Sequence, residues 1–534
     1  MKITGLSKVL VAEGYSSTEI NHHSSKTNTS IMKSLYLFIV ITILTTCMSC
    51  QNSNPSNQSN NQNDSSNAMP ADTAMLAAAY DQYKEESITK KRFKHADLEP
   101  LLHKLTANPQ FKLHRLGQSV QKRNIYQLEY GSGPKKVMLW SQMHGDESTA
   151  TMALLDIFNF LAGQDDGFDT VRNLIRENTH LYFIPMLNPD GAEIFNRRNA
   201  MAIDINRDAR SGTTPEGKIL IEAAKTVQPE YGFNLHDQQP YYSAGYSKTP
   251  ATISFLAPAY NYERDTNEVR ADAMRLIVGM NQLLQHYIPN GVAKYDDTHE
   301  PRGFGDNFQK WGARTVLIES GGYPNDPEKQ FIRKLNFFII LNGLIDIATD
   351  NYKNYSAEDY MSIPENTSKH HDLLIRNLTY QSDTLQYKTD LGINQNQYTL
   401  DKGNYYVRGI VADVGDLLES AGYEELDADG LTMTPGKVYE ETFETIQDIS
   451  ADHAWDLIQQ GYYAVRLENM PEERAHNLPL LVLNEANPPG GGMHLGMAAN
   501  FFLSKGSRLQ YAVINGYLID LNNKTEREFK QYVR

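Results

Sequence analysis

Residues 136–161 read KVMLWSQMHGDESTATMALLDIFNFL. The stretch opens with an apolar run, turns at His144-Gly145-Asp146-Glu147, and then carries apolar residues at helical spacing. We predict a buried strand over 136–143 and an amphipathic helix over 148–161. A strand that leads at once into a helix is typical of α/β proteins.

The alternation of strands and helices continues over residues 124–350. The predicted strands are 125–130, 136–143, 181–186, 231–235 and 315–318, and the helices that alternate with them are 148–161, 215–226, 270–286 and 328–348. The sequence thus predicts an α/β fold, a three-layer sandwich around a mixed sheet. In such sheets, ligands bind beyond the carboxyl ends of the strands.

Candidate metal ligands stand at the ends of these predicted strands. His144 and Glu147 share the turn after 136–143, and His236 follows 231–235 directly. Catalytic zinc takes three protein ligands from histidine and carboxylate groups and keeps a fourth position for water. A His-x-x-Glu turn alone also occurs on ordinary surfaces, and a lone histidine at a strand end is more often structural. The zinc hypothesis therefore depends on all three side chains meeting at one edge of the sheet.

Glu319 ends the strand 315–318 and precedes Gly321-Gly322. A carboxylate at the end of a strand that is buried on both faces is costly unless it has a partner or a role. Glu319 is the candidate general base, which would take a proton from the metal's water and pass it to a leaving amine. The alternative is a carboxylate hydrogen-bonded to backbone amides of the glycine turn.

The composition argues against some functions and some ligands. The 534 residues carry a formal net charge of −15 with no long Lys/Arg run, which argues against a nucleic-acid partner. The two cysteines, Cys47 and Cys50, both lie at the end of an N-terminal apolar segment. Any metal site further along the chain must therefore use His, Asp or Glu.

Several blocks, in their order along the chain, resemble the M14 family of zinc metallocarboxypeptidases, over roughly residues 124–350. The blocks are the turn 144–147, Asn188-Pro189-Asp190-Gly191, Arg197 with Asn199, Asp204-Ile205-Asn206-Arg207, the strand ending in His236 and the strand ending in Glu319. The resemblance implies one zinc ion per chain, held by His144, Glu147 and His236. It also implies that Glu319 is the base that activates the zinc water.

The resemblance further implies the contacts with substrate. Arg197 falls where the family carries the arginine that polarises the scissile carbonyl, and Asn206 and Arg207 fall where it binds a free carboxylate. A fixed guanidinium binds more strongly as the carbonyl oxygen becomes negative, and its planar fork matches a carboxylate. The implied enzyme is a carboxypeptidase that acts on peptides with a free C-terminus. Alternatively, both arginines have solvated or ion-paired surface roles.

The sequence departs from the family pattern at three places. Asp208 follows Asn206-Arg207 where many relatives have a neutral residue, so we expect a less cationic carboxylate pocket. Tyr295 lies near the place of the family's mobile tyrosine but aligns poorly with it. The side-chain pocket is expected around 303–308, where Asp306 either favours a basic terminal residue or holds a turn.

The N-terminal region carries a targeting pattern. We interpret residues 1–31 as an upstream extension that is not native, 32–50 as a signal peptide of the lipoprotein type, and 51–70 as a flexible Asn/Ser linker. Ser49-Cys50 fits a lipoprotein cleavage site, so Cys50 is the candidate for a lipid anchor. This predicts export, either to the periplasm or to the membrane of a bacterial envelope. The alternative is a plain cleaved signal peptide with incidental cysteines.

Near residue 350 the sequence changes from alternating strand and helix patterns to short β-rich runs. We expect a catalytic domain over 71–352, a linker over 353–369 and a mainly β accessory domain over 370–534. The strands predicted in the accessory domain are 372–379, 397–411, 431–433, 462–466, 480–483 and 509–521, with a loop at 488–492. Segments at 372–377, 427–436 and 512–516 weakly resemble the small β-sandwich that flanks the barrel of amidohydrolases. The barrel is missing here, so we expect a structural or interaction role.

Three functions compete. The first is the zinc carboxypeptidase. The second is an amidase or deacylase on the same scaffold, acting on small acylated amino acids or cell-wall peptides, because fold does not fix substrate. The third is a catalytically inactive surface-binding lipoprotein that uses the β domain to hold a partner. It is the least favoured function. An enzyme that had lost its activity should have lost a metal ligand, the general base or an arginine, whereas the candidates for all of these are present.

Overall fold

The structure is a computed structural model that describes residues 72–382, 384–484, 492–524 and 526–534. These residues belong to one compact unit. The predicted signal peptide, the anchor at Cys50, the linker 51–70 and most of the predicted loop 488–492 lie outside the described residues. Among the described residues, no helix combines the length and the apolar composition that a membrane span requires.

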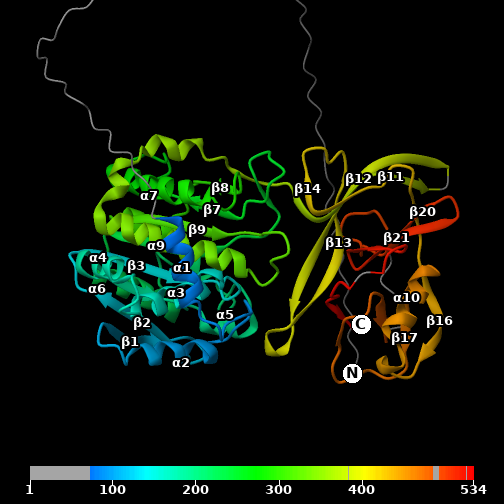
Figure 1. Ribbon diagram of the computed structural model, residues 1–534, viewed down its shortest axis with the longest axis horizontal. Helices are drawn as coiled ribbons and strands as arrows, with labels where there is room; N and C mark the ends of the chain where they lie inside the picture. Colours follow the sequence, from blue (N-terminus) through cyan, green and yellow to red (C-terminus); the bar gives the residue numbers. More distant parts are fainter. Residues whose placement is uncertain (1–71, 383, 485–491, 525) are drawn as a thin grey trace, which may run out of the picture. The chain divides into compact units, whose positions relative to one another are not determined.

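A mixed sheet of eight strands lies at the centre of the first part of the chain, in the order β1-β2-β4-β3-β5-β9-β7-β8 (Figure 1). Its strands are β1 (Phe111–Gln118), β2 (Asn124–Gly131), β3 (Lys135–Ser141), β4 (Thr179–Ile184), β5 (Tyr231–Asp237), β7 (Ile253–Leu256), β8 (Val292–Lys294) and β9 (Arg314–Ser320). The four central strands β4, β3, β5 and β9 are parallel, whereas β2 and β7 join them antiparallel. The predicted α/β fold with a mixed sheet is confirmed.

The helices cover both faces of this sheet, because the central strands are apolar on both sides. In β3, Val137 and Leu139 pack into a cluster with α1 (Thr73–Tyr83), α3 (Thr149–Ala162), α7 (Glu268–Leu284) and α9 (Gln330–Thr349). The alternate residues Met138 and Trp140 pack into a second cluster with α6 (Pro215–Val227) and α8 (Phe304–Lys310). Side chains of a strand alternate between its faces, so one strand supplies both layers.

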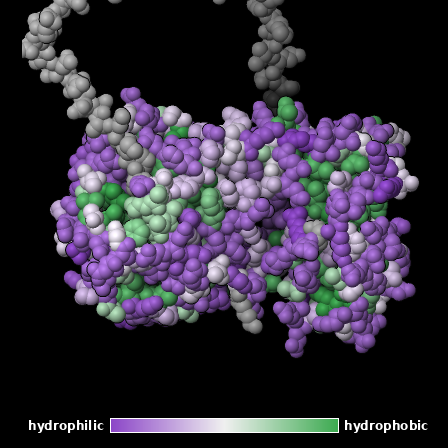
Figure 2. Space-filling view, viewed as in Figure 1, coloured by the Kyte–Doolittle hydropathy of each residue, from purple (hydrophilic) through white to green (hydrophobic). Residues whose placement is uncertain are grey.

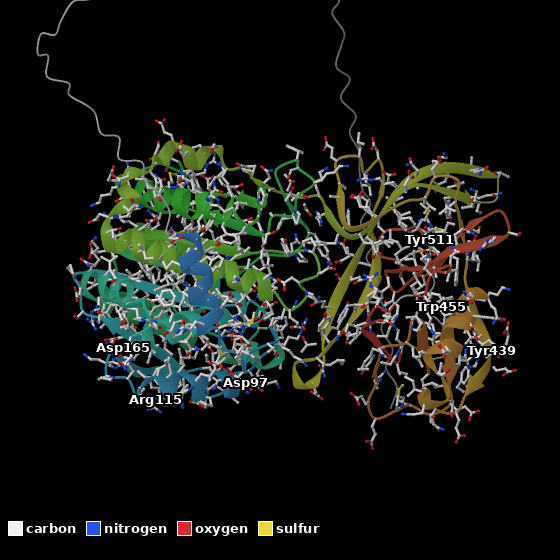
Figure 3. The ribbon with its side chains drawn as sticks, viewed as in Figure 1. Asp97, Arg115, Asp165, Tyr439, Trp455 and Tyr511 are labelled. Atoms are coloured by element: carbon white, nitrogen blue, oxygen red, sulfur yellow. The ribbon has the colours of Figure 1, made fainter. Side chains whose placement is uncertain are left out.

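Polar residues occupy the outer surface of these layers. The charged side chains labelled in Figure 3 on α2 (His95–Leu105), on β1 and in the loop after α3 are exposed; they are Asp97, Arg115 and Asp165. The face seen in Figure 2 is mainly hydrophilic. This agrees with helices that turn one apolar stripe towards the sheet.

The second part of the chain is rich in strands, as predicted. Its main sheet runs β13-β12-β11-β15-β20-β21-β22, and β14 pairs with β11. The bounds are β11 (His370–Ser382), β12 (Leu385–Thr399), β13 (Tyr405–Gly415), β14 (Ala421–Asp427), β15 (Thr432–Thr434), β20 (Phe501–Lys505), β21 (Arg508–Ile514) and β22 (Tyr517–Asp520).

A smaller parallel sheet completes this part, in the order β16-β17-β19. Its strands are β16 (Lys437–Phe443), β17 (Tyr462–Leu467) and β19 (Leu481–Leu483), and α10 (Ala451–Gln459) connects the first two. Trp455 of α10 lies in a hydrophobic cluster of this part, and Tyr439 of β16 packs against that cluster (Figure 3). This cluster holds no residue of the clusters around the first sheet.

Two predicted strands of the second part are wrong as single elements. The run 397–411 is divided between β12 and β13 by a turn at Asp401–Gly403, where Gly403 has a φ of 70°. The run 509–521 is a hairpin, in which Asn515 and Gly516 have φ values of 53° and 78° between β21 and β22. Positive φ at both central residues is what a type I′ hairpin turn requires.

Candidate active site

The parallel strands β3, β5 and β9 bring the candidate residues to one edge of the sheet. His144 and Glu147 lie in the turn between β3 and α3, while His236 and Glu319 lie near the ends of β5 and β9. In the pairing of β5 with β9, His236 stands directly opposite Glu319. Neighbouring parallel strands end at the same edge, so side chains distant in sequence meet there.

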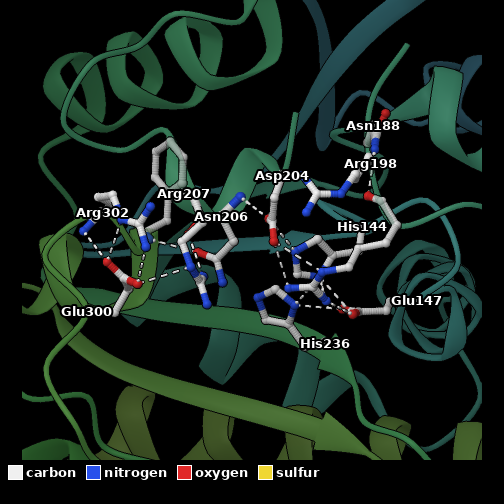
Figure 4. Close-up of polar contacts among 12 residues, drawn as sticks. His144, Glu147, Asn188, Arg198, Asp204, Asn206, Arg207, His236, Glu300 and Arg302 are labelled. Carbon is white, nitrogen blue, oxygen red and sulfur yellow. Dashed lines mark hydrogen bonds and ion pairs between the residues drawn. The ribbon is translucent and has the colours of Figure 1, made fainter. Parts of the chain in front are cut away.

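His144, Glu147 and His236 form a compact buried cluster, the metal triad. Nδ1 of His144 lies 2.7 Å from one carboxylate oxygen of Glu147, and Nδ1 of His236 lies 2.7 Å from the other. The two Nδ1 atoms are 3.2 Å apart, and one donor atom from each of the three residues lies within 4.8 Å of the others (Figure 4). Tetrahedral ligands at zinc distances lie roughly 3.3 Å apart, so the three donors fit one such ion.

Asp204 orients His144 within the metal triad. Its Oδ1 lies 3.0 Å from Nε2 of His144, on the opposite side of the ring from Glu147. A proton held at Nε2 by this carboxylate leaves the lone pair of Nδ1 directed at the triad. A carboxylate behind a histidine is the usual support of a ligating imidazole, because it fixes the tautomer and raises the basicity of the ring. The sequence analysis assigned Asp204 no role, although it lies in the block 204–207.

The charges of the metal triad are strongly coupled. Burial lowers the pKa of His144, but the Glu147 and Asp204 carboxylates outweigh burial and raise it to about 9. Burial raises the pKa of Glu147, yet the two histidines hold it well below its usual range. Burial lowers the pKa of His236. Without an ion the cluster thus favours an anionic carboxylate beside one protonated imidazole.

Arg197 reaches the triad from the loop after α5 (Pro189–Ile194). Its Nη1 lies 3.0 Å from Glu147, and its Nε and Nη2 lie 3.1 and 3.0 Å from Oδ2 of Asp204. The loop is held in turn by Asn188, whose side chain donates to the carbonyl of Arg197. The guanidinium is half-exposed, so a ligand at the triad has access to it.

Asn206 and Arg207 lie beside the triad in a short 3₁₀ turn (Ile205–Arg207), and Figure 4 shows Asn206 between the triad and Glu300. Asn206 accepts a hydrogen bond of 2.9 Å from the backbone N–H of Phe304, the first residue of α8. Nε of Arg207 lies 3.1 Å from Glu300, and Arg302 binds the same carboxylate at 2.9 Å. Glu300 was absent from the sequence analysis, since an exposed loop carries no periodic signal.

Glu319 is partly buried at the end of β9. Burial and the nearby Glu147 carboxylate raise the pKa of Glu319 well above its usual range. Tyr295, which follows β8, is close enough to Glu319 that burial and this carboxylate raise the pKa of the tyrosine. The phenol ring of Tyr295 also meets that of Tyr242 edge-on, with centroids 6.1 Å apart. A carboxylate and a phenol therefore lie near the metal triad.

Two acidic residues have local roles that the sequence left open. The carboxylate of Asp208 accepts hydrogen bonds from Thr213 and Thr214, whereas the acid that meets Arg207 is Glu300. The carboxylate of Asp306 accepts from the backbone of Glu300 at 2.9 Å and lies 3.1 Å from His299. Asp306 thus holds the turn before α8, which was one of its two expected roles.

Comparison with known proteins gives one family. Residues 98–283 match the family model described as zinc carboxypeptidase. Carboxypeptidase D of Rattus norvegicus is 24% identical over 311 residues, which cover 47% of this chain and 22% of that protein. Carboxypeptidase M of Mus musculus is 29% identical over 147 residues, or 23% of this chain and 33% of that protein. The chain thus covers about a fifth to a third of these curated relatives.

Among solved structures, a metallo-carboxypeptidase from Burkholderia cenocepacia is similar at 18% identity with a TM-score of 0.41. The match covers 48% of this chain and 70% of that one.

Proposed function

We propose that this protein is a zinc-dependent metallocarboxypeptidase that removes the C-terminal amino acid from peptides, because residues 98–283 match the family model described as zinc carboxypeptidase. One observation carries the proposal. Two histidines and a glutamate that could hold one metal ion lie within 4.8 Å of one another, and the half-exposed guanidinium of Arg197 contacts this triad at Glu147.

We propose that the metal triad holds one zinc ion. The donor set of two imidazoles and one carboxylate, with no thiolate, suits catalytic zinc, and the fourth coordination position remains for water. A bound zinc ion lowers the pKa of its water and polarises a carbonyl oxygen. The protein supplies the geometry, since Asp204 fixes the ring of His144.

Two further residues would act at the scissile bond. Glu319 takes a proton from the attacking water and delivers it to the leaving amine, and its place on β9 opposite His236 puts it at the edge of the sheet where the triad lies. Arg197 donates to the carbonyl oxygen as negative charge develops there, and its fixed contacts with Asp204 reduce the reorganisation required.

Asn206 and Arg207 would bind the free terminal carboxylate, which makes the enzyme an exopeptidase. Glu300 engages Arg207 through Nε, and this contact holds the guanidinium in place. Nη1 of Arg207 donates to the backbone carbonyl of Asn206 at 2.8 Å, so the N–H groups of Nη2 and the second N–H of Nη1 are the donors left for a carboxylate. Because Arg302 shares Glu300, the acid is balanced by two cations and does not cancel Arg207 alone.

We also propose that the protein is exported and anchored through Cys50, on the pattern of residues 32–50. The catalytic domain would span 71–352 and the accessory β domain 370–534, joined by 353–369. Mass spectrometry of the N-terminal peptide from the cell envelope tests the anchor. A diacylglyceryl mass on Cys50 is expected, and an unmodified Cys50 would refute it.

Metal analysis coupled to a peptide screen tests the proposed activity. We expect about one zinc per chain, loss of activity with a chelator, and recovery with added zinc. His236→Ala should release the metal, because two ligands do not retain zinc against a chelator. Stoichiometric zinc in that variant, or hydrolysis only of acylated amino acids and amides, would contradict the proposal.

A further inference from the structure

Two loops leave the first sheet directly after the candidate site residues. The β5 exit, residues 238–242, begins two residues after His236, and the β9 exit, residues 321–323, begins two residues after Glu319. A metal ligand and a general base must keep one separation during the reaction, and a misplacement of about 1 Å can cost about 100-fold in rate. The contacts that hold these two loops therefore bear on the proposed catalysis.

Tyr423 of β14 contacts both exits. Its hydroxyl donates to the backbone carbonyl of Pro240 in the β5 exit at 2.7 Å. A Cβ at Gly322 of the β9 exit would overlap this hydroxyl and would lie 2.8 Å from Cβ of Pro240. The two exits also meet where they begin, because the N–H of Gln238 donates to the carbonyl of Ser320 at 3.0 Å. One side chain of the strand-rich second part of the chain thus touches both loops.

Strand β11 holds the β5 exit at a second point. The hydroxyl of Tyr241 donates to Asp372 at 2.7 Å, and the N–H of His370 donates to the carbonyl of Tyr241 at 3.0 Å. The ring of His370 meets that of Tyr423 edge-on, with centroids 4.3 Å apart. Since β11 and β14 pair in parallel, these contacts belong to one sheet and move together.

The β9 exit depends on such outside contacts, because it begins with Gly321-Gly322. Glycine has the largest conformational freedom of any residue, so a pair of glycines keeps one conformation only where neighbouring groups impose it. The N–H of Gly321 donates to the carbonyl of Thr252 at 2.9 Å. At Gly322, the atoms nearest to the position of a Cβ belong to Tyr423 and Pro240. Tyr423 therefore limits where the β9 exit can lie.

We propose that Tyr423 is a positioning residue for the candidate active site. By bonding to the β5 exit and covering the β9 exit, it fixes the separation between His236 and Glu319. The inference rests on the proposed carboxypeptidase function and gives the strand-rich second part a role in it. Tyr423 acts through the two loops and not on the substrate, so it affects kcat and leaves KM unchanged.

Tyr423→Phe tests the role of the hydroxyl, because it keeps the ring and removes the bond to Pro240. The productive arrangement then loses at most the worth of one hydrogen bond, so kcat at saturating zinc should fall about 2- to 13-fold with KM unchanged. Tyr517→Phe is the matched control, because the hydroxyl of Tyr517 accepts from the N–H of Lys530 at 3.0 Å within the second part. It should lower Tm and leave kcat unchanged. An unchanged kcat in Tyr423→Phe, or a change in KM alone, would overturn the inference.

Gly322→Ala tests the contact from the side of the β9 exit. The added methyl group overlaps the hydroxyl of Tyr423, so the exit must move, and kcat should fall by up to about 100-fold. Gly322→Ala combined with Tyr423→Phe frees part of this space. The double variant should therefore retain more activity than the product of the two single effects, as expected for residues in contact. Independent effects would overturn the inference.

Amide hydrogen exchange keeps the two claims distinguishable if the zinc-loaded protein hydrolyses no peptide. That result would refute the proposed function. Exchange over 238–242 and 321–323 should still be faster in Tyr423→Phe than in the unmodified protein, whereas Tyr517→Phe should leave it unchanged. Equal exchange in Tyr423→Phe and the unmodified protein would overturn the role of Tyr423 as well.

Discussion

Replacement of Asp204 by asparagine tests how the chain supports its metal triad. Oδ1 of Asp204 lies 3.0 Å from Nε2 of His144, and Oδ2 lies 3.1 and 3.0 Å from two nitrogens of Arg197. Asparagine keeps the shape of the side chain but loses the negative charge. One oxygen becomes an NH2 group, which then faces an N–H donor of either the histidine or the arginine.

Two effects of Asp204→Asn follow from these contacts. Loss of a carboxylate behind a ligating histidine weakens metal binding by about 10- to 100-fold, or about 1.4 to 2.8 kcal/mol. Release of Arg197 removes a donor to the carbonyl oxygen, which lowers kcat by about 100- to 1,000-fold even at saturating zinc. The zinc Kd and kcat should therefore both change, and added zinc should restore only the first.

Competition with a chromophoric chelator measures the zinc Kd, and peptide hydrolysis at saturating zinc measures kcat. Asp272→Asn is the matched control, because Asp272 is a buried acid that binds Arg275 and Arg314 from α7. It should lower Tm and leave the zinc Kd unchanged. A wild-type Kd in Asp204→Asn would refute the reasoning that Asp204 orients His144.

Two other predictions concern proton transfer. Glu319→Gln should retain zinc but lose about 100- to 10,000-fold in kcat, because an amide cannot accept the water's proton; near-normal turnover would exclude Glu319 as the base. The pKa of His144 in the metal-free protein is raised from 6.5 to about 9, so protonated His144 stabilises that protein fully below pH 6.5 and the effect is lost as pH rises through 9. Over this pH window the Tm of the metal-free protein should fall and its zinc affinity should rise. Calorimetry in buffers of different ionisation enthalpy should show about one proton released per zinc bound at pH 7.5. A zinc affinity that does not change with pH would contradict this prediction.

Long periodic elements were predictable from the sequence. All nine strands and helices predicted over residues 124–350 are present, with ends displaced by about two residues or less. Two of the missed elements lack a hydrophobic period: β8 has three residues, and α4 (Asp169–Asn178) buries only Arg172 and Ile175. Helix α2 was also missed, although it buries Leu98, Leu102 and Leu105 at helical spacing. Asn515-Gly516 is a typical sequence for a hairpin turn, but the apolar residues on both sides of it led to the prediction of one continuous strand over 509–521.

The candidate site was predictable where side chains are placed by strand ends. His144, His236 and Glu319 follow or close apolar strands, and parallel pairing brings such positions to one edge. Their catalytic roles stay predictions. The pair Arg207–Glu300 joins two loops nearly a hundred residues apart, so no local pattern could predict it.

Cleavage of one peptide with a free or an amidated C-terminus tests the central claim most directly. If Arg207 binds the terminal carboxylate, amidation removes a charge-assisted pair worth about 1.5 to 3 kcal/mol, or about 10- to 150-fold in kcat/KM. The penalty should shrink towards one in Arg207→Ala. It should persist in Arg302→Ala, which removes the other arginine bound to Glu300. Equal cleavage of the free and amidated peptides by the unmodified, zinc-loaded protein would contradict the carboxypeptidase assignment.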